Sequence, residues 1–267
     1  MTKNSPDNAT NDFLYEVQGG IGYATLNRPS ARNALTISMY DGLAEVCRNV
    51  PHDGSVKAIV ISGTGDKAFA AGTDISHFRE FTKPEDGLDY EAHMDKVFHA
   101  IETCPVTTIS VLHGACTGGG AAIAVASDIR IAAEDLKFGI PIARTLGNCL
   151  SARNLGRFAA LMGKGRAMEM MFTSRLLGAQ EVYAMGLVTD VLDDKSAALA
   201  KADELANQVG SHAPLTLRST KEAFRRLSEY QSKVDDSDLI VQCYMSEDFR
   251  EGMDAFLAKR APQWKGR

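Results

Sequence analysis

Two glycine-rich loops are the part of this sequence best suited to chemistry. Residues 118–120 are three consecutive glycines between a predicted strand and a predicted helix, and residues 68–75 (AFAAGTDI) follow the predicted strand 56–62. Glycine lets a ligand approach the backbone closely, and the first N–H groups of a helix lack intrahelical partners. Two such loops can together hold one oxyanion, as the stabilisation of an enolate requires. Three glycines alone are equally consistent with tight packing.

The glycines do not fit the common nucleotide-binding motifs. Their spacing is not GxGxxG, and no Lys-Ser or Lys-Thr pair follows them as in a phosphate-binding loop. The five cysteines are odd in number and widely spaced, and none of them forms a CxxC pair. The sequence therefore predicts no disulfide framework, no metal site and no redox cofactor.

Length and composition are those of an ordinary globular protein. The 267 residues are 45% hydrophobic and 24% charged, which suits one core domain with a small appendage. With a net charge of -5, the sequence indicates no extended basic surface for binding nucleic acid. Residues 1–12 are polar and predict a disordered tail, not a signal peptide, and polar residues interrupt the apolar stretch 106–133, which predicts buried core, not a membrane span. With reduced cysteines, these features favour a cytoplasmic protein.

Alternating strands and helices must position the two loops. Alternating residues on both sides of Gly19-Gly20 predict a β-hairpin, and the apolar spacing after Thr36 predicts a helix. Further apolar runs predict strands over 56–62, 108–112 and 129–132, and a helix over 121–126. Helical patterns dominate beyond residue 150, with three helical stretches and no strand from about residue 197. This order predicts an α/β core over 13–196 and a helical region over 197–267.

Motifs along nearly the whole chain resemble the crotonase (enoyl-CoA hydratase/isomerase) superfamily. The matching segments, in family order, are LNRP (26–29) with NAL (33–35), AFAAGTDI (68–75), HGACTGGGAAIAVASDIRIA (113–132), KFGIP (137–141), AMEMMFTSR (167–175), AQEVYAMGLV (179–188) and EDFREGMDAFLAKRAP (247–262). The resemblance implies a spiral of ββα units with a C-terminal helical trimerisation region. It also implies a homotrimer or a dimer of trimers.

The resemblance implies an acyl-CoA thioester substrate, so that coenzyme A enters as part of the substrate. By the matching motifs, the thioester oxygen is held by the backbone N–H groups of Thr73 and Gly119. The implied substrate-binding residues are Arg28, Ala70, Ala71, Gly72, Asp74, Ile75, Gly118, Ala122, Ile142, Asn148 and Lys259, with Arg28 and Lys259 directed to the coenzyme A phosphates.

The sequence departs from the family at the two positions where the hydratases carry catalytic glutamates. These positions are occupied by Ala122 and Ile142. Losing a general acid or base typically costs about 10²–10⁴-fold in rate, so the standard hydratase mechanism is not expected. We expect an enolate-stabilising lyase or isomerase with another base. Two alternatives stay open: a catalytically silent acyl-CoA-binding protein, and hydration with water positioned by Asn148 or Thr145.

Several side chains are candidates for the missing acid or base. Cys149 follows Gly147-Asn148 in a segment that resembles the region where the 4-chlorobenzoyl-CoA dehalogenase branch carries an aspartate nucleophile; a thiolate can act as a nucleophile, but a free cysteine is more often buried and inert. Among the histidines, His77 is the best candidate because it lies four residues after Thr73. Glu80, Glu91 and Asp95 are the acidic candidates in segment 76–103. They can also point inward, although acidic residues on helices usually face solvent.

Overall fold

The computed structural model describes residues 12–231 and 235–267. The predicted tail, residues 1–12, lies outside the described residues except for Asp12, whose carbonyl accepts a hydrogen bond from the Asn27 N–H. No helix within the described ranges is long and apolar enough to cross a membrane.

The larger of two sheets has six strands in the order β1-β2-β3-β5-β7-β10. Only the hairpin strands β1 and β2 pair antiparallel; the other neighbours are parallel. The bounds are β1 (Phe13–Gln18), β2 (Ile21–Leu26), β3 (Ala58–Gly63), β5 (Thr107–Leu112), β7 (Ile129–Ala133) and β10 (Asp190–Leu192). The predicted hairpin and the three predicted apolar strands are all present; β2, β3, β5 and β7 have five or six mostly buried residues each, which is long enough for a sequence pattern to reveal.

The smaller sheet was not expected from the sequence, and it carries both glycine-rich loops. Its strands, in the order β4-β6-β8-β9, are β4 (Ala68–Ala70), β6 (Ala115–Thr117), β8 (Lys137–Gly139) and β9 (Leu177–Gly178). Strands β4 and β6 are parallel neighbours. The residues that follow them, Ala71 onward and Gly118 onward, therefore leave the sheet at the same edge.

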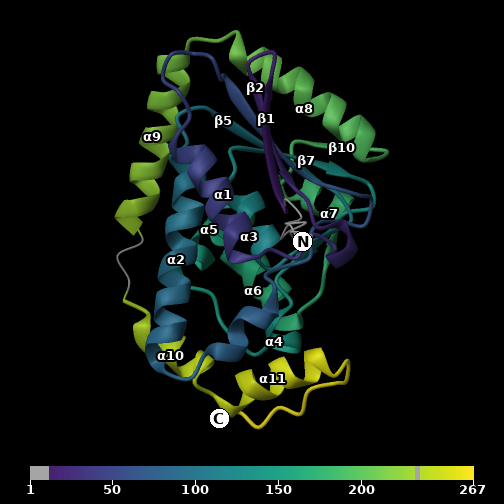
Figure 1. Cartoon of the computed structure of the whole chain (residues 1–267), viewed down its shortest axis with the longest axis vertical. Coiled ribbons are helices and arrows are strands. Elements are labelled where there is room, and N and C mark those ends of the chain that lie inside the picture. The colour runs from purple at the N-terminus through teal and green to yellow at the C-terminus, as the bar shows by residue number, and fades with distance from the viewer. Residues whose placement is uncertain (1–11, 232–234) are drawn as a thin grey trace, which may run out of the picture.

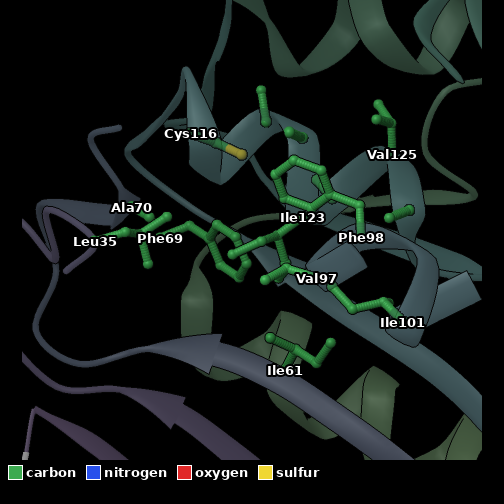
Figure 2. Packing of buried hydrophobic residues seen from close by; sticks show 14 of the residues in the cluster. Leu35, Ile61, Phe69, Ala70, Val97, Phe98, Ile101, Cys116, Ile123 and Val125 are labelled. Atoms are coloured by element: carbon green, nitrogen blue, oxygen red, sulfur yellow. The ribbon is translucent and has the colours of Figure 1, made fainter. Parts of the chain in front are cut away.

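Three helices cover one face of the large sheet. They are α1 (Ile37–Arg48), α2 (Pro84–Glu102) and α3 (Gly119–Ala126), and α2 packs against both of the others. Figure 2 shows Val97 and Phe98 of α2 beside Ile123 of α3, in one buried cluster with Phe69 of β4. This packing fixes α2 and α3 relative to the small sheet.

Helix α8 (Lys195–Gly210) covers the opposite face of the large sheet (Figure 1). Its Ala198, Ala202 and Ala206 form a second apolar cluster with residues of the sheet such as Val60 and Ile109. Small side chains at a spacing of four let this helix lie close to the strands. The structure thus places α8 with the core, whereas the predicted boundary at residue 196 assigns nearly all of it to the C-terminal region.

The other helices of the described residues pack around this core. They are the 3₁₀ helices η1 (Pro29–Ala31) and η2 (Ile75–Glu80), and α4 (Ile142–Thr145), α5 (Ala152–Met162), α6 (Lys164–Thr173), α7 (Ala179–Ala184), α9 (Pro214–Gln231), α10 (Ser237–Tyr244) and α11 (Glu247–Leu257). Helix α10 packs on α2, and α11 contacts α4 and η2 at the bottom of Figure 1. The C-terminal chain therefore returns to the end of the molecule where η2 and α4 lie.

Close packing between β4 and α3 gives a stability prediction. A Cβ atom on Gly120 would lie 2.8 Å from the Ala70 Cβ and would overlap the Ala70 carbonyl oxygen. We expect Gly120→Ala to lower the free energy of unfolding by about 1–3 kcal/mol, the usual effect of overpacking, as measured by urea denaturation. In the matched variant Gly156→Ala, the new methyl on α5 meets no atom within 4 Å. That variant is expected to gain up to about 1 kcal/mol from helix propensity.

Candidate active site

A cavity of about 120 Å³ lies beside the edge of the small sheet where β4 and β6 end. Helices α2, α3, α4 and α11 contribute to its wall. Nine of the residues expected to bind substrate or hold its oxygen line this cavity: Ala71, Gly72, Thr73, Ile75, Gly118, Gly119, Ala122, Ile142 and Asn148. The sequence motifs and the cavity therefore coincide.

The backbone around Thr73 leaves its N–H group available. Leu35 donates its N–H to the Gly72 carbonyl, and its own carbonyl accepts from the Asp74 N–H, both at 2.8 Å. This short parallel bridge uses the groups on either side of Thr73. Within the described part of the chain, the Thr73 N–H has no hydrogen-bond acceptor.

Gly119 is the first residue of α3, so its N–H has no intrahelical partner. Gly72 and Gly118 adopt φ angles of 111° and 54°, which side-chain-bearing residues rarely reach. A Cβ on Gly118 would lie only 3.3 Å from the Gly72 Cα. The two loops therefore touch, and the backbones of Thr73 and Gly119 line the same cavity.

Two buried tyrosines hold the Thr73 side chain. The Thr73 hydroxyl is hydrogen-bonded to Tyr40 Oη at 2.9 Å and to Tyr90 Oη at 3.0 Å. Burial raises the pKa values of Tyr40 and Tyr90 above the ordinary value of a tyrosine, so both hydroxyl groups stay neutral. Helices α1 and α2 thereby fix one of the two loops from the side.

The positions of the two hydratase glutamates are apolar in space as well as in sequence. Ala122 of α3 is 2% exposed, and Ile142 begins α4. Both side chains line the cavity. They present methyl groups where a hydratase of this family presents carboxylates.

A carboxyl group nevertheless lies in the cavity wall, on α2. Glu91 is 3% exposed. Its Oε1 accepts a hydrogen bond from Tyr244 Oη at 2.8 Å, and its Oε2 accepts from the Ser151 N–H at 2.9 Å. Burial raises the pKa of Glu91 to about 7, although these two hydrogen bonds act in the opposite direction.

The structure separates Glu91 from the other acidic candidates, which helical spacing could not do, because Asp95 lies four residues further along α2 on the same helix face. Glu91, Met94 and Phe98 have the spacing of one helix face, and that face is buried. Glu80, by contrast, is exposed, and Asp95 pairs with Arg157 at 3.2 Å outside the cavity lining. Only Glu91 of the three acidic candidates borders the cavity.

Tyr244 connects Glu91 to another polar group of the cavity. Its hydroxyl also accepts from Asn148 Nδ2 at 3.3 Å. The Asn148 Oδ1 is buried and has no hydrogen-bond partner among the described residues. Glu91 and Asn148, which both line the cavity, are thus held by the same C-terminal tyrosine.

Cys149 and His77 do not line the cavity. The Cys149 Sγ points to the Leu239 carbonyl of α10 at 3.8 Å. A hydrogen bond with the Cys243 thiol and burial raise the pKa of Cys149, so the thiolate that a nucleophile needs is disfavoured. His77 is exposed, and its ring packs on Phe81 with 5.5 Å between centroids. Neither residue fits the acid, base or nucleophile hypothesis.

The remaining expected substrate-binding residues do not line the cavity. Arg28 is 3.0 Å from Asp74 and 3.2 Å from Asp12, so two carboxylates already balance its charge. Ala70 is fully buried at the end of β4. Lys259 is exposed just after α11, whose Phe256 lines the cavity. The assignment of Arg28 and Lys259 to coenzyme A phosphates stays a prediction.

Comparisons with known proteins agree with the geometry. The family model for enoyl-CoA hydratase/isomerase matches residues 16–267. A short-chain-enoyl-CoA hydratase of Clostridium acetobutylicum is 32% identical over 255 residues, which are 94% of this chain and 96% of that protein. A crotonyl-CoA hydratase of Syntrophomonas wolfei is 30% identical, with 94% and 97% covered.

Solved structures extend the comparison. A methylmalonyl-CoA decarboxylase in complex with 2-nitronate-propionyl-CoA superimposes with a TM-score of 0.86 at 25% identity, over 96% of this chain and 98% of that one. An enoyl-CoA hydratase from Mycobacterium avium subsp. paratuberculosis gives 0.79 at 26% identity, over 95% and 98%. These matches confirm the predicted α/β crotonase fold. The chain belongs to the enoyl-CoA hydratase/isomerase family.

Proposed function

We propose that this protein binds an acyl-CoA thioester in the cavity and stabilises its enolate. The Thr73 and Gly119 N–H groups donate to the thioester oxygen, and this interaction strengthens as the oxygen gains negative charge. The observation that carries the proposal is that these two unpaired donors, from adjacent loops of the described chain, line one cavity. The reaction is of the lyase or isomerase type, with a base other than residues 122 and 142.

The direct test is exchange of the α-protons of saturated acyl-CoA thioesters in deuterated water. Enolate formation and its reversal replace these protons by deuterium, which mass spectrometry detects. We expect exchange that depends on the protein and saturates with thioester concentration. Tight binding without exchange on any thioester would instead identify a catalytically silent acyl-CoA-binding protein.

Crotonyl-CoA provides a complementary prediction about hydration. Because Ala122 and Ile142 present no carboxylate, we expect hydration no faster than in buffer, as followed by the absorbance of the enoyl thioester. Asn148 and Thr145 also line the cavity, but the Thr145 hydroxyl donates to the Pro141 carbonyl at 3.0 Å. Protein-dependent hydration would instead favour a water molecule positioned by these polar groups.

Decarboxylation of an acyl-CoA with an α-carboxylate is a second candidate. It is favoured by the similarity to methylmalonyl-CoA decarboxylase, with TM-scores of 0.86 and 0.85 in two structures. Loss of carbon dioxide creates the enolate directly, so no carboxylate base is required at positions 122 and 142. Release of carbon dioxide from methylmalonyl-CoA tests this candidate.

We also propose that the chain forms a homotrimer or a dimer of trimers. Helix α9 supports self-association because Phe224 and Leu227, three residues apart on one face of it, are 67% and 65% exposed. Large apolar side chains exposed together on one helix are typical of an interface. The mass of the particle in solution, measured by light scattering, tests this assembly.

A further inference from the structure

We propose that Glu91 is the acid–base residue of this site, and that it exchanges a proton with the acyl group held by Thr73 and Gly119. The proposal rests on the proposed enolate chemistry and identifies the group that moves the proton. In this proposal α2 supplies the carboxylate. Helices α3 and α4 have none at the corresponding cavity positions, because these are occupied by Ala122 and Ile142.

The position of Glu91 next to the oxyanion-binding loops is the first support. Tyr90, the preceding residue of α2, contacts the Thr73 hydroxyl at 3.0 Å. Glu91 itself borders the same cavity as Thr73 and Gly119. Glu91 and the residues that carry the two N–H donors therefore line one cavity.

The hydrogen bonds of Glu91 fix the carboxyl group but leave it able to accept a proton. Each carboxylate oxygen accepts one bond, from Tyr244 Oη and from the Ser151 N–H. An ionised carboxylate has about four acceptor sites, so about two remain. A base that is held in place and still has free lone pairs meets the geometric requirement for proton transfer.

The electrostatic surroundings suit a base that works near neutral pH. Burial raises the pKa of Glu91 to about 7, with smaller upward contributions from Asp95 and Asp236. The titratable groups that interact with Glu91 come from four segments: Tyr40 of α1, Tyr90 and Asp95 of α2, Cys149 before α5, and Asp236 and Tyr244 at α10. Arg157 of α5 is engaged by Asp95 and Glu102.

The proposed step conserves atoms and electrons. A Glu91 carboxylate oxygen takes the α-proton, and the electron pair of the broken C–H bond forms the carbon–carbon double bond of the enolate. The π pair of the thioester carbonyl moves to its oxygen, where the Thr73 and Gly119 N–H groups stabilise it. Return of the proton from Glu91 reverses the step. In deuterated water the proton on the Glu91 carboxyl group exchanges with solvent before the return, so that a deuteron is transferred to the α-carbon.

The test compares two glutamate-to-glutamine variants on the same helix. Glu91→Gln is expected to lower α-proton exchange by about 10²–10⁴-fold, the usual cost of removing a general base, with unchanged binding of propionyl-CoA. Glu102→Gln is the control, since Glu102 ends α2, pairs with Arg157 and does not line this cavity. It is expected to keep the exchange rate. Equal exchange in Glu91→Gln and the parent protein would overturn the proposal.

The pH profile separates catalysis from a structural role. Because the carboxylate is the base, exchange by the parent protein is expected to rise with pH around a midpoint of about 7. Tyr244→Phe keeps Glu91 but removes a hydrogen bond that lowers its pKa, so the midpoint is expected to move to higher pH. An unmoved midpoint would contradict the proposal even if Glu91→Gln failed to fold. Absence of exchange in the parent protein would instead refute the enolate function itself.

Discussion

Gly119→Ala is expected to lower α-proton exchange by about 10²–10³-fold, as does the loss of one oxyanion donor in other enzymes. The alanine retains an N–H group, but its Cβ would overlap Tyr40 Oη and lie 3.1 Å from Thr73 Oγ1. Helix α3 or the Thr73 loop must shift in response. A displacement of about 1 Å is enough for a loss of this size. Deuterium incorporation into propionyl-CoA measures it.

The matched control keeps the alanine at residue 119 and removes the atom that it overlaps. Tyr40→Phe deletes the overlapping hydroxyl, and the remaining Tyr40 Cζ lies 3.0 Å from the Cβ position at residue 119. We expect the double variant Tyr40→Phe, Gly119→Ala to regain part of the lost exchange. Full exchange in Gly119→Ala alone would show that the N–H group at this position does not hold the enolate oxygen.

Arg157→Met is expected to lower the free energy of unfolding by about 3–5 kcal/mol, the typical cost of breaking a buried ion pair. Arg157 is 8% exposed and binds both oxygens of Glu102, at 2.8 and 2.9 Å. Its Nη1 binds Asp95 at 3.2 Å. Methionine fills a similar space but leaves two partly buried carboxylates without their cation. Urea denaturation at neutral pH measures the change.

An exposed arginine serves as the comparison. Arg175 pairs with Glu169 at 2.5 Å and with Glu181 at 2.6 Å, but all three side chains are at least one third exposed. We expect Arg175→Met to cost less than about 1 kcal/mol, since water screens exposed ion pairs. If the two variants cost the same, burial is not the source of the Arg157 effect.

The sequence predicted the strands that are long enough to show a pattern of apolar residues. Strands β3, β5 and β7 were predictable because each is five or six residues long and contains at least three large or small apolar residues. The strands of the small sheet have two or three residues each, which is too short for any periodicity. The place of α8 on the sheet depends on alanines, which a hydrophobic pattern barely distinguishes from a solvent-exposed helix face.

The candidate site also has a part that the sequence predicts and a part that only the structure reveals. The backbone donors Thr73 and Gly119 belong to contiguous motifs, so a sequence resemblance reaches them. Glu91 is defined by partners far away in the chain: Ser151 is 60 residues away and Tyr244 is 153 residues away. An acidic residue on a helix is usually solvated. Only tertiary structure reveals that this one is enclosed.

The return of α10 and α11 to the cavity has a consequence for biosynthesis. Tyr244 holds the Glu91 carboxyl group, and Phe256 closes part of the cavity wall. Ribosomes add about 5–20 residues per second during synthesis. The glycine loops are therefore made well before the residues that orient Glu91 and close the cavity. Tyr244 and Phe256 are synthesised after the rest of the cavity wall, so the Glu91 carboxyl group is held and the cavity is closed only once the C-terminal residues are present.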